Sequence, residues 1–198
     1  MTNKDNGVNI ISTRPYHHGD LRASLVSAGL DLLKKQTVDD ISLREVARSV
    51  GVSATAVYRH FPDKQALLYA LCEEGREILA EAQRVAMAVS GGGQKGFDAT
   101  GLAYVRFALA NPSLFRLMAK TRPSDVPRDT GKPAVNVAMQ VLQSNVAKIL
   151  PKGATNREQQ VRAIRAWSLA HGVAMLILDG RIPENEKLII DVLREPKR

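Results

Sequence analysis

The stretch from residue 42 to residue 61 constrains the fold more than any other part of this sequence. Its first half has apolar residues at helical spacing, namely Leu43, Val46, Ala47 and Val50. Ser42 and Glu45 form the pattern of a capping box, in which two side chains satisfy free backbone amides at a helix start. Gly51 follows the last apolar residue, where helices often end in a left-handed glycine. The stretch therefore predicts a short helix with a defined start and a defined end.

A second short helix is predicted directly after that glycine. Ser53 suits its N-cap, and Pro62 ends it because the residue before a proline disfavours helical geometry. Val57 and Phe61 are spaced to lie on one apolar side of this helix. The second helix is therefore expected to pack on the first through these two side chains.

Two helices joined by a short turn that contains a glycine define a helix-turn-helix. We therefore predict this motif over residues 42–61, with its second helix over 53–61. The small Ala47 lies where the two helices would cross, which close packing requires. An ordinary helical hairpin is the alternative, because Ala-x-x-x-Gly by itself occurs in many hairpins.

The remainder of the chain is also predicted to be helical, so the fold class is all-α with about nine helices. No stretch alternates apolar and polar residues over a strand length, and helix-forming residues dominate the periodic segments. The further helices are expected at about 20–35, from Asp63 to a glycine linker at 90–93, and at 96–110, 112–119, 134–149, 156–179 and 184–194. The long helix from Asp63 is expected to bury Leu68, Leu71, Gly75, Ile78, Ala82 and Val85.

The composition argues against several classes of protein. Cys72 is the only cysteine, so an intrachain disulfide or a cysteine-based zinc site is not expected. The four histidines form no His-Glu-x-x-His pattern, and the glycines at 91–96 lack the spacing of a phosphate-binding loop. We therefore expect no catalytic residue, no metal and no cofactor. No run of about 18 apolar residues is present, so we expect a cytoplasmic protein without a membrane partner.

The net charge favours an anionic partner. The chain has 28 Lys and Arg against 20 Asp and Glu, a formal charge of +8. Such a charge is typical of nucleic-acid-binding proteins, although solubility alone is the other explanation. Much of the excess lies between residues 116 and 132, outside the predicted motif, and the sequence assigns that basic segment no role.

The exposed side of the second helix is the predicted DNA-reading surface. In a helix-turn-helix this helix enters the major groove with its first residues near base edges, and hydroxyls or basic groups around it contact phosphates. The alternative for each residue is an ordinary solvated side chain. The predicted DNA contacts are Ser42, Arg44, Ser53, Ala54, Thr55, Tyr58, Arg59, His60 and Lys64.

The sequence from Ile41 to Leu71 resembles one known family closely. It reads ISLREVARSVGVSATAVYRHFPDKQALLYAL, and the run VYRHF followed by DKQAL is typical of the DNA-binding domain of TetR/AcrR transcriptional regulators. The resemblance extends over residues 17–79. It implies that Tyr58, His60 and Lys64 contact phosphates of double-stranded DNA.

The C-terminal half resembles the same family more weakly. Residues 167–172 read WSLAHG and are similar to a group of TetR C-terminal domains with a Trp-His-Gly signature. The resemblance implies a helical bundle that forms a homodimer through its last two helices and holds a small-molecule effector. Apolar residues on those helices that permit such an interface are Val161, Ile164, Leu169, Leu176, Leu188, Ile189 and Val192.

Aromatic and methionine side chains in this half are candidates for an effector pocket, because such side chains commonly line small-molecule cavities. A filled core is the alternative for each of them. The candidates are Tyr104, Phe107, Leu114, Phe115, Met118, Trp167, His171 and Met175.

Together these patterns predict a flexible N-terminal arm at 1–16, a helix-turn-helix domain at 17–79 and an effector-binding and dimerisation domain at 80–198. The expected function is sequence-specific transcription regulation by a dimeric repressor, which an effector releases from a palindromic operator. An effector-independent, nucleoid-type DNA-binding protein is the alternative.

Overall fold

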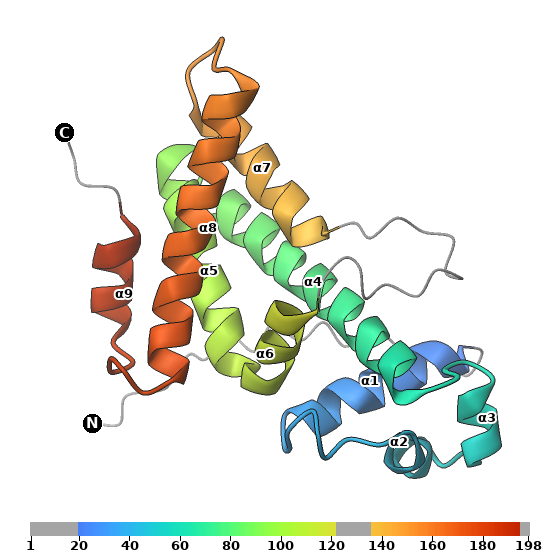
Figure 1. Cartoon of the computed structure of the whole chain (residues 1–198). Coiled ribbons are helices and arrows are strands. Elements are labelled where there is room, and N and C mark those ends of the chain that lie inside the picture. The colour runs from blue at the N-terminus through green and yellow to red at the C-terminus, as the bar shows by residue number, and fades with distance from the viewer. Residues whose placement is uncertain (1–19, 122–135, 195–198) are drawn as a thin grey trace.

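The computed structural model describes residues 20–121 and 136–194, and the described residues form nine helices and no strand (Figure 1). The predicted all-α fold is therefore confirmed. The expected N-terminal arm and most of the basic segment lie outside the described residues. The helices are α1 Leu21–Leu33, α2 Leu43–Val50, α3 Ala54–Tyr58, α4 Lys64–Val89, α5 Gly93–Ala110, α6 Pro112–Lys120, α7 Val137–Ile149, α8 Asn156–Leu178 and α9 Glu186–Leu193.

Side-chain caps fix the starts of the described helices except α5 and α6. Thr155 and Glu158 form a complete capping box at the start of α8. Ser42 accepts a hydrogen bond from the Glu45 amide at 3.2 Å, but the Glu45 carboxylate does not return it. It accepts instead from the Gln36 side-chain amide at 2.9 Å. The capping box predicted at Ser42 and Glu45 is thus half formed, because Glu45 ties α2 to the loop that follows α1.

Helices α1 to α3 form a compact unit around fully buried side chains. Gly51 ends α2 with a φ of +79°, the left-handed geometry expected of a C-terminal glycine. Val46 and Val57 are both 0% exposed and join α2 to α3. Helix α3 ends at Tyr58, earlier than expected, and the chain continues as a turn that leaves Phe61 1% exposed. The Arg22 guanidinium of α1 lies 5.2 Å from the centre of the Phe61 ring.

Helix α4 joins this unit to the rest of the molecule. It packs on α1 and α6 near its start and on α5 and α7 along its length (Figure 1). Its first half buries the residues that the sequence suggests, but its second half does not. Val85 is exposed, and the buried positions are instead Leu79, Gln83 and Met87. The difference arises because α5 and α7 cover this side of α4, and Gln83 interrupts the apolar pattern there.

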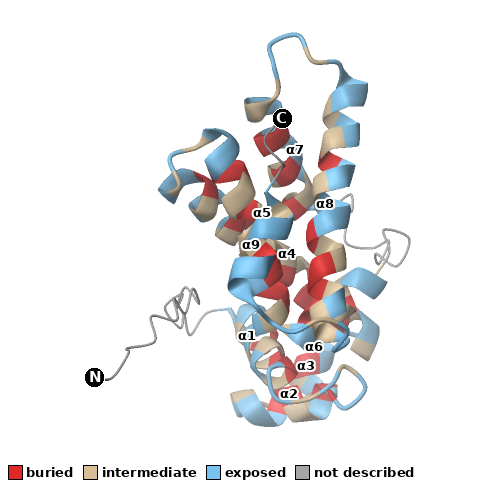
Figure 2. Ribbon diagram, turned by 90° about the vertical axis from the view of Figure 1, so that its left-hand side faces the viewer, coloured by how far each residue is buried: buried red, intermediate tan, exposed pale blue. Residues whose placement is uncertain are grey.

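The remaining helices enclose the upper part of α4. Buried residues gather where α4, α5, α7 and α8 meet (Figure 2). Helix α5 begins at Gly93, three residues before the expected start, after Gly91 and Gly92 with φ values of +79° and +72°. Helices α8 and α9 lie at the outer side of the molecule (Figure 1).

Helix α8 is unusually apolar for its exposed position. Its most apolar window of 18 residues has a mean hydropathy of 1.3, and 22% of that window is buried, so by length and composition it passes the test for a membrane-crossing helix. Core helices of soluble proteins pass the same test. Helix α8 is hydrogen-bonded to α5 through Trp167 and to α6 through its C-terminal carbonyl group.

Candidate nucleic-acid interface and effector cavity

The predicted DNA contacts lie on one exposed side of the α2–α3 unit. Thr55, Tyr58, Arg59 and His60 are exposed on α3 or in the turn after it, and the Tyr58 side chain is 48% exposed despite its aromatic ring. Ala54 is half-buried at the first turn. Ser53 is exposed and its hydroxyl oxygen accepts from the Ala56 amide at 3.2 Å. The start of α3 therefore lies at the surface, next to the exposed side of the helix.

The helix ends around α3 bring several predicted residues together. Ser42, Arg44, Tyr58 and Lys64 share one shallow surface groove between α2 and the start of α4. The Lys64 ammonium group donates to the Asp39 carbonyl oxygen at 2.9 Å, which anchors this side chain beside the groove. Hydroxyl and cationic groups around helix N-termini are the donors that bind DNA phosphates. The arrangement suits contacts with the DNA backbone beside an inserted α3.

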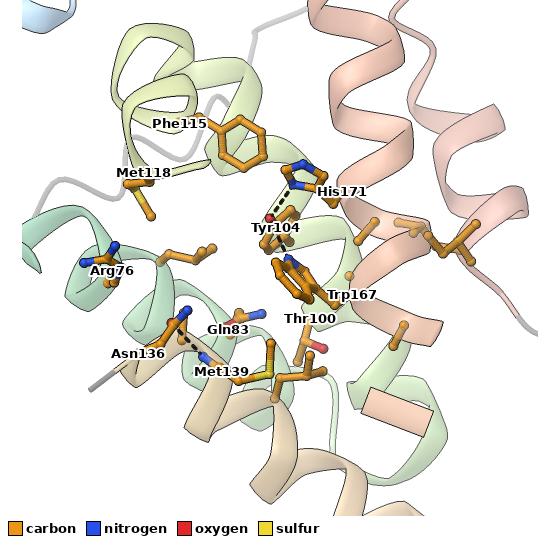
Figure 3. Close-up of a pocket in the computed structure, with 18 of the residues that line it drawn as sticks. Arg76, Gln83, Thr100, Tyr104, Phe115, Met118, Asn136, Met139, Trp167 and His171 are labelled. Carbon is orange, nitrogen blue, oxygen red and sulfur yellow. Dashed lines mark hydrogen bonds between the residues drawn. The ribbon is translucent and has the colours of Figure 1, made fainter. Parts of the chain in front are cut away.

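A cavity of about 500 Å³ lies between α4, α5, α7 and α8 (Figure 3). Of the candidates named from the sequence, Tyr104, Phe115, Met118, Trp167 and His171 line it. Phe107, Leu114 and Met175 do not. Phe107 and Leu114 are 6% and 4% exposed in the main core, and Met175 packs against that core. These three side chains fill space between helices, which is the alternative that the sequence leaves open.

Tyr104 connects two of these residues by hydrogen bonds. Its hydroxyl group lies 3.0 Å from His171 Nδ1 and accepts from Trp167 Nε1 at 3.2 Å (Figure 3). Burial raises the pKa of Tyr104 and lowers the pKa of His171. Both shifts favour a protonated phenol and a neutral imidazole, and the hydrogen bond joins these two uncharged groups. The Phe115 ring packs against both rings, with its centre 5.4 Å from that of His171.

The cavity also has lining residues that the sequence does not single out. They include Arg76 and Gln83 of α4, Thr100 of α5, and Asn136 and Met139 at the start of α7. Gln83 had one available signal, since it stands four residues from both Leu79 and Met87 on a buried helical face. From the sequence alone, a polar residue at this spacing only interrupts the apolar side of the helix. That it lines a cavity becomes evident once the positions of the surrounding helices are known.

Helix α6 contacts three functional regions at once. Its Phe115 and Met118 line the cavity, while the Ser113 hydroxyl donates to the Gln36 carbonyl oxygen at 3.0 Å, in the loop that precedes α2. Arg116 donates to the Leu178 carbonyl oxygen at 3.1 Å and to the Asp179 carboxylate at 2.6 Å, at the end of α8. One residue of the basic segment thereby acquires a structural role.

We expect the protein to lose stability as the pH falls from 7.5 to 5, and His171 to contribute to that loss. Burial lowers the pKa of folded His171, whereas the unfolded ring titrates near its ordinary value of about 6.5. In acid the unfolded state then binds more protons, so the free energy of unfolding decreases below that value and is unaffected above it. In urea unfolding experiments across this pH range, the free energy of unfolding should depend less steeply on pH for His171→Gln than for the unsubstituted protein. An unchanged dependence would contradict the assignment.

Comparison with known proteins agrees with this geometry. Residues 25–71 match the family of bacterial regulatory proteins of the tetR type, and residues 97–193 match the tetracyclin repressor-like C-terminal domain. A protein with unknown function from Rhodococcus sp. RHA1 is 32% identical, with 90% of this chain and 93% of that chain covered and a TM-score of 0.70.

Two further solved structures share the fold. A tetR-family transcriptional regulator from Streptomyces coelicolor is 24% identical, over 87% of this chain and 76% of that chain, with a TM-score of 0.65. The multidrug binding protein EbrR, complexed with imidazole, is 16% identical, over 88% and 93% of the two chains, with a TM-score of 0.60. The N-terminal match covers the helix-turn-helix, and the C-terminal match covers most of the residues that line the cavity. These two matched domains establish that the chain belongs to the TetR family and is a DNA-binding transcriptional regulator.

Proposed function

We propose that the protein is a homodimeric repressor that leaves a palindromic operator when a small molecule enters the cavity between α4, α5, α7 and α8. The observation that carries this proposal is the connection between the cavity and the helix-turn-helix. Helix α6 lines the cavity with Phe115 and is hydrogen-bonded through Ser113 to the loop before α2. A ligand that binds better to a state with another position of α6 therefore also favours another position of the helix-turn-helix. The size of this population shift is set by the difference in ligand affinity between the two states.

The proposed dimer interface is the outer face of α8 and α9. Single exposed apolar side chains are ordinary, but a cluster on two adjacent helices is typical of a subunit interface. Large exposed apolar residues on these helices, apart from the cavity-lining Trp167, are Val161, Ile164, Leu169, Leu176, Leu188 and Val192. Gly172 lies on the same helix with open space where a Cβ would stand, which permits close approach of a second helix. Ile189, also named from the sequence, is 5% exposed and packs inward instead.

A dimer gives the operator its symmetry. Two helix-turn-helix units related by a twofold axis read two half-sites about 34–36 Å apart, so the preferred DNA is palindromic. The proposed DNA contacts are those predicted from the sequence, with Tyr58 and Lys64 on phosphates and Thr55 near a base edge. We place the protein in the cytoplasm, where this DNA lies, and propose no catalytic activity and no cofactor.

Selection of DNA from a random duplex pool tests the proposal. The protein should enrich a palindromic sequence and bind it in the presence of excess unrelated DNA. Its affinity should fall steeply with salt, because phosphate contacts release counterions. A nucleoid-type protein would share the salt dependence without the enrichment. A pool that yields no common sequence would exclude the repressor and favour that alternative.

Two substitutions on α3 should separate phosphate contacts from base contacts. Tyr58→Phe removes one hydroxyl and should weaken binding to the selected operator and to unrelated DNA by a similar factor, about 5- to 10-fold for one lost hydrogen bond. Thr55→Ala should leave unrelated DNA unaffected and reduce the preference for one base pair in each half-site, by roughly 1–3 kcal/mol. Gel shifts on operator variants measure both effects. A Thr55→Ala protein with unaltered base preference would remove this residue from the reading surface.

A further inference from the structure

One wall of the cavity contains a buried polar group that no described residue satisfies. Gln83 of α4 is 4% exposed, and its Oε1 atom has no hydrogen-bond partner. The side chain lines the cavity, on the α4 wall near Thr100 and below Tyr104 (Figure 3). A buried acceptor without a partner destabilises a folded protein, and most such groups in native proteins are paired. Gln83 therefore points to an occupant of the cavity that supplies a donor.

The polar groups around Gln83 are engaged elsewhere. The Thr100 hydroxyl donates to the Phe97 carbonyl oxygen at 2.6 Å. The Arg76 guanidinium is paired with the Glu73 carboxylate one turn earlier on the same helix. The Tyr104 hydroxyl is held between Trp167 and His171, as described above. Each of these groups already has a hydrogen-bond or ion-pair partner, and none of them is paired with Gln83 Oε1.

The charges on the lining do not provide a site for an ionised ligand. Arg76 and Glu73 neutralise each other, and Asp98 accepts a hydrogen bond from the Gln94 amide at 2.7 Å. Arg162 stacks on the Phe97 ring, with 5.1 Å between the guanidinium carbon and the ring centre. Arg165 and Arg194, which also line the cavity, are solvent-exposed. An ion in the apolar interior would need a free counter-charge there, so the lining favours an uncharged molecule.

We propose that the cavity binds an uncharged, largely apolar molecule that donates a hydrogen bond to Gln83 Oε1, as a carboxamide, a lactam or an alcohol does. The inference rests on the proposed role of this cavity as the effector site. A molecule that fills the cavity displaces water from the Gln83 amide and loses affinity unless it replaces that hydrogen bond. A site with a buried polar group discriminates strongly against analogues that lack the matching group.

Two matched pairs of uncharged compounds test the proposal on the DNA-free protein. Decanamide and methyl nonyl ketone have equal size and differ only in an NH₂ or CH₃ group beside the carbonyl. Naphthalene carboxamide and acetylnaphthalene form the same pair on a flat frame, which suits the aromatic wall. Calorimetric titration should show the amide binding about 10-fold more tightly than the ketone in at least one pair. Trp167, the only tryptophan, reports occupancy by the alkyl pair through its fluorescence. Non-specific partitioning would favour the ketone, so this order is diagnostic.

A variant and a matched control identify the responsible residue. Gln83→Met keeps the length of the side chain and removes its amide, so the preference for the amide probe should vanish. Asn145→Leu is the control, because Asn145 of α7 is also 4% exposed with an unpaired Nδ2 atom but does not line the cavity. Both variants remove a buried unpaired group and should raise the melting temperature. Only Gln83→Met should alter the ratio of amide to ketone affinity.

Three results would overturn the inference: equal affinities within both pairs, failure of all four compounds to bind, or an amide preference that survives Gln83→Met. The DNA selection described above is independent of these titrations. If the DNA selection yields an operator but no probe binds, the proposed repressor function stands and the inference about Gln83 is wrong. Probe binding without an enriched DNA sequence would remove the repressor while the ligand assignment stands.

Discussion

Ile164→Glu combined with Leu176→Glu is expected to convert the proposed dimer into monomers and to weaken operator binding by about 100- to 10,000-fold. Both side chains lie on α8, with exposed fractions of 49% and 46%. In a dimer through α8 and α9 the substitutions bury four carboxylates without counter-charges, which costs far more than the lost apolar contacts. In a dimer, binding of one subunit to its half-site holds the second subunit close to the other half-site. A monomer loses this gain in affinity, which is typically about 100- to 10,000-fold.

Sedimentation and gel shifts on the same samples test this expectation. Val89→Glu is a suitable control, because Val89 is an 83% exposed apolar residue at the end of α4, outside the proposed interface of α8 and α9. The control should remain dimeric and bind the operator normally. A double variant that remains dimeric would place the interface on another face of the molecule.

Phe61→Ala is expected to lower the free energy of unfolding by about 3–5 kcal/mol, the range for a large aromatic side chain removed from a packed core. Phe61 is 1% exposed, and its ring lies beneath the Arg22 guanidinium of α1. Truncation leaves a void between α1 and the turn after α3, so the reading helix loses its support. Operator binding should decrease together with stability.

Tyr58→Ala separates these two effects, since Tyr58 stands on the preceding turn and is 48% exposed. Its stability should change by less than about 0.5 kcal/mol, whereas its DNA affinity should fall. Chemical denaturation of both variants provides the measurement. A similar loss of stability for Tyr58→Ala and Phe61→Ala would mean that the exposed ring contributes to packing.

The elements that the sequence predicts best are those with local causes. Gly51 ends α2 because its backbone has a positive φ, and Ser53 starts α3 through a contact within three residues. Such features depend on neighbours in the chain and are readable from it. The sequence predicts that α3 continues to residue 61, whereas the helix ends at Tyr58, because a turn after Tyr58 buries Phe61 nearly as well as another helical turn would.

The cavity depends on contacts between distant segments, and this limits what the sequence can provide. Trp167 and His171 are one turn apart and predictably share a face, but their common partner Tyr104 lies 67 residues before His171 and becomes evident only in the fold. Phe107 and Phe115 are the same type of residue in the same half of the chain, so the sequence does not distinguish them, yet Phe107 fills the core and Phe115 lines the cavity. Which aromatic residues face a cavity is decided by the rotation of each helix against its neighbours.

The unbroken course of α4 has a consequence for how such proteins can be recombined. The expected division between the two functional halves, after residue 79, falls inside this helix, so no linker separates them. A helix advances about 100° per residue. One inserted residue within α4 would therefore turn the entire sensing half relative to the reading half and break every contact that α6 makes across it. Exchange of halves between relatives, in evolution or in the construction of chimeric biosensors, has to preserve the helical phase of this junction.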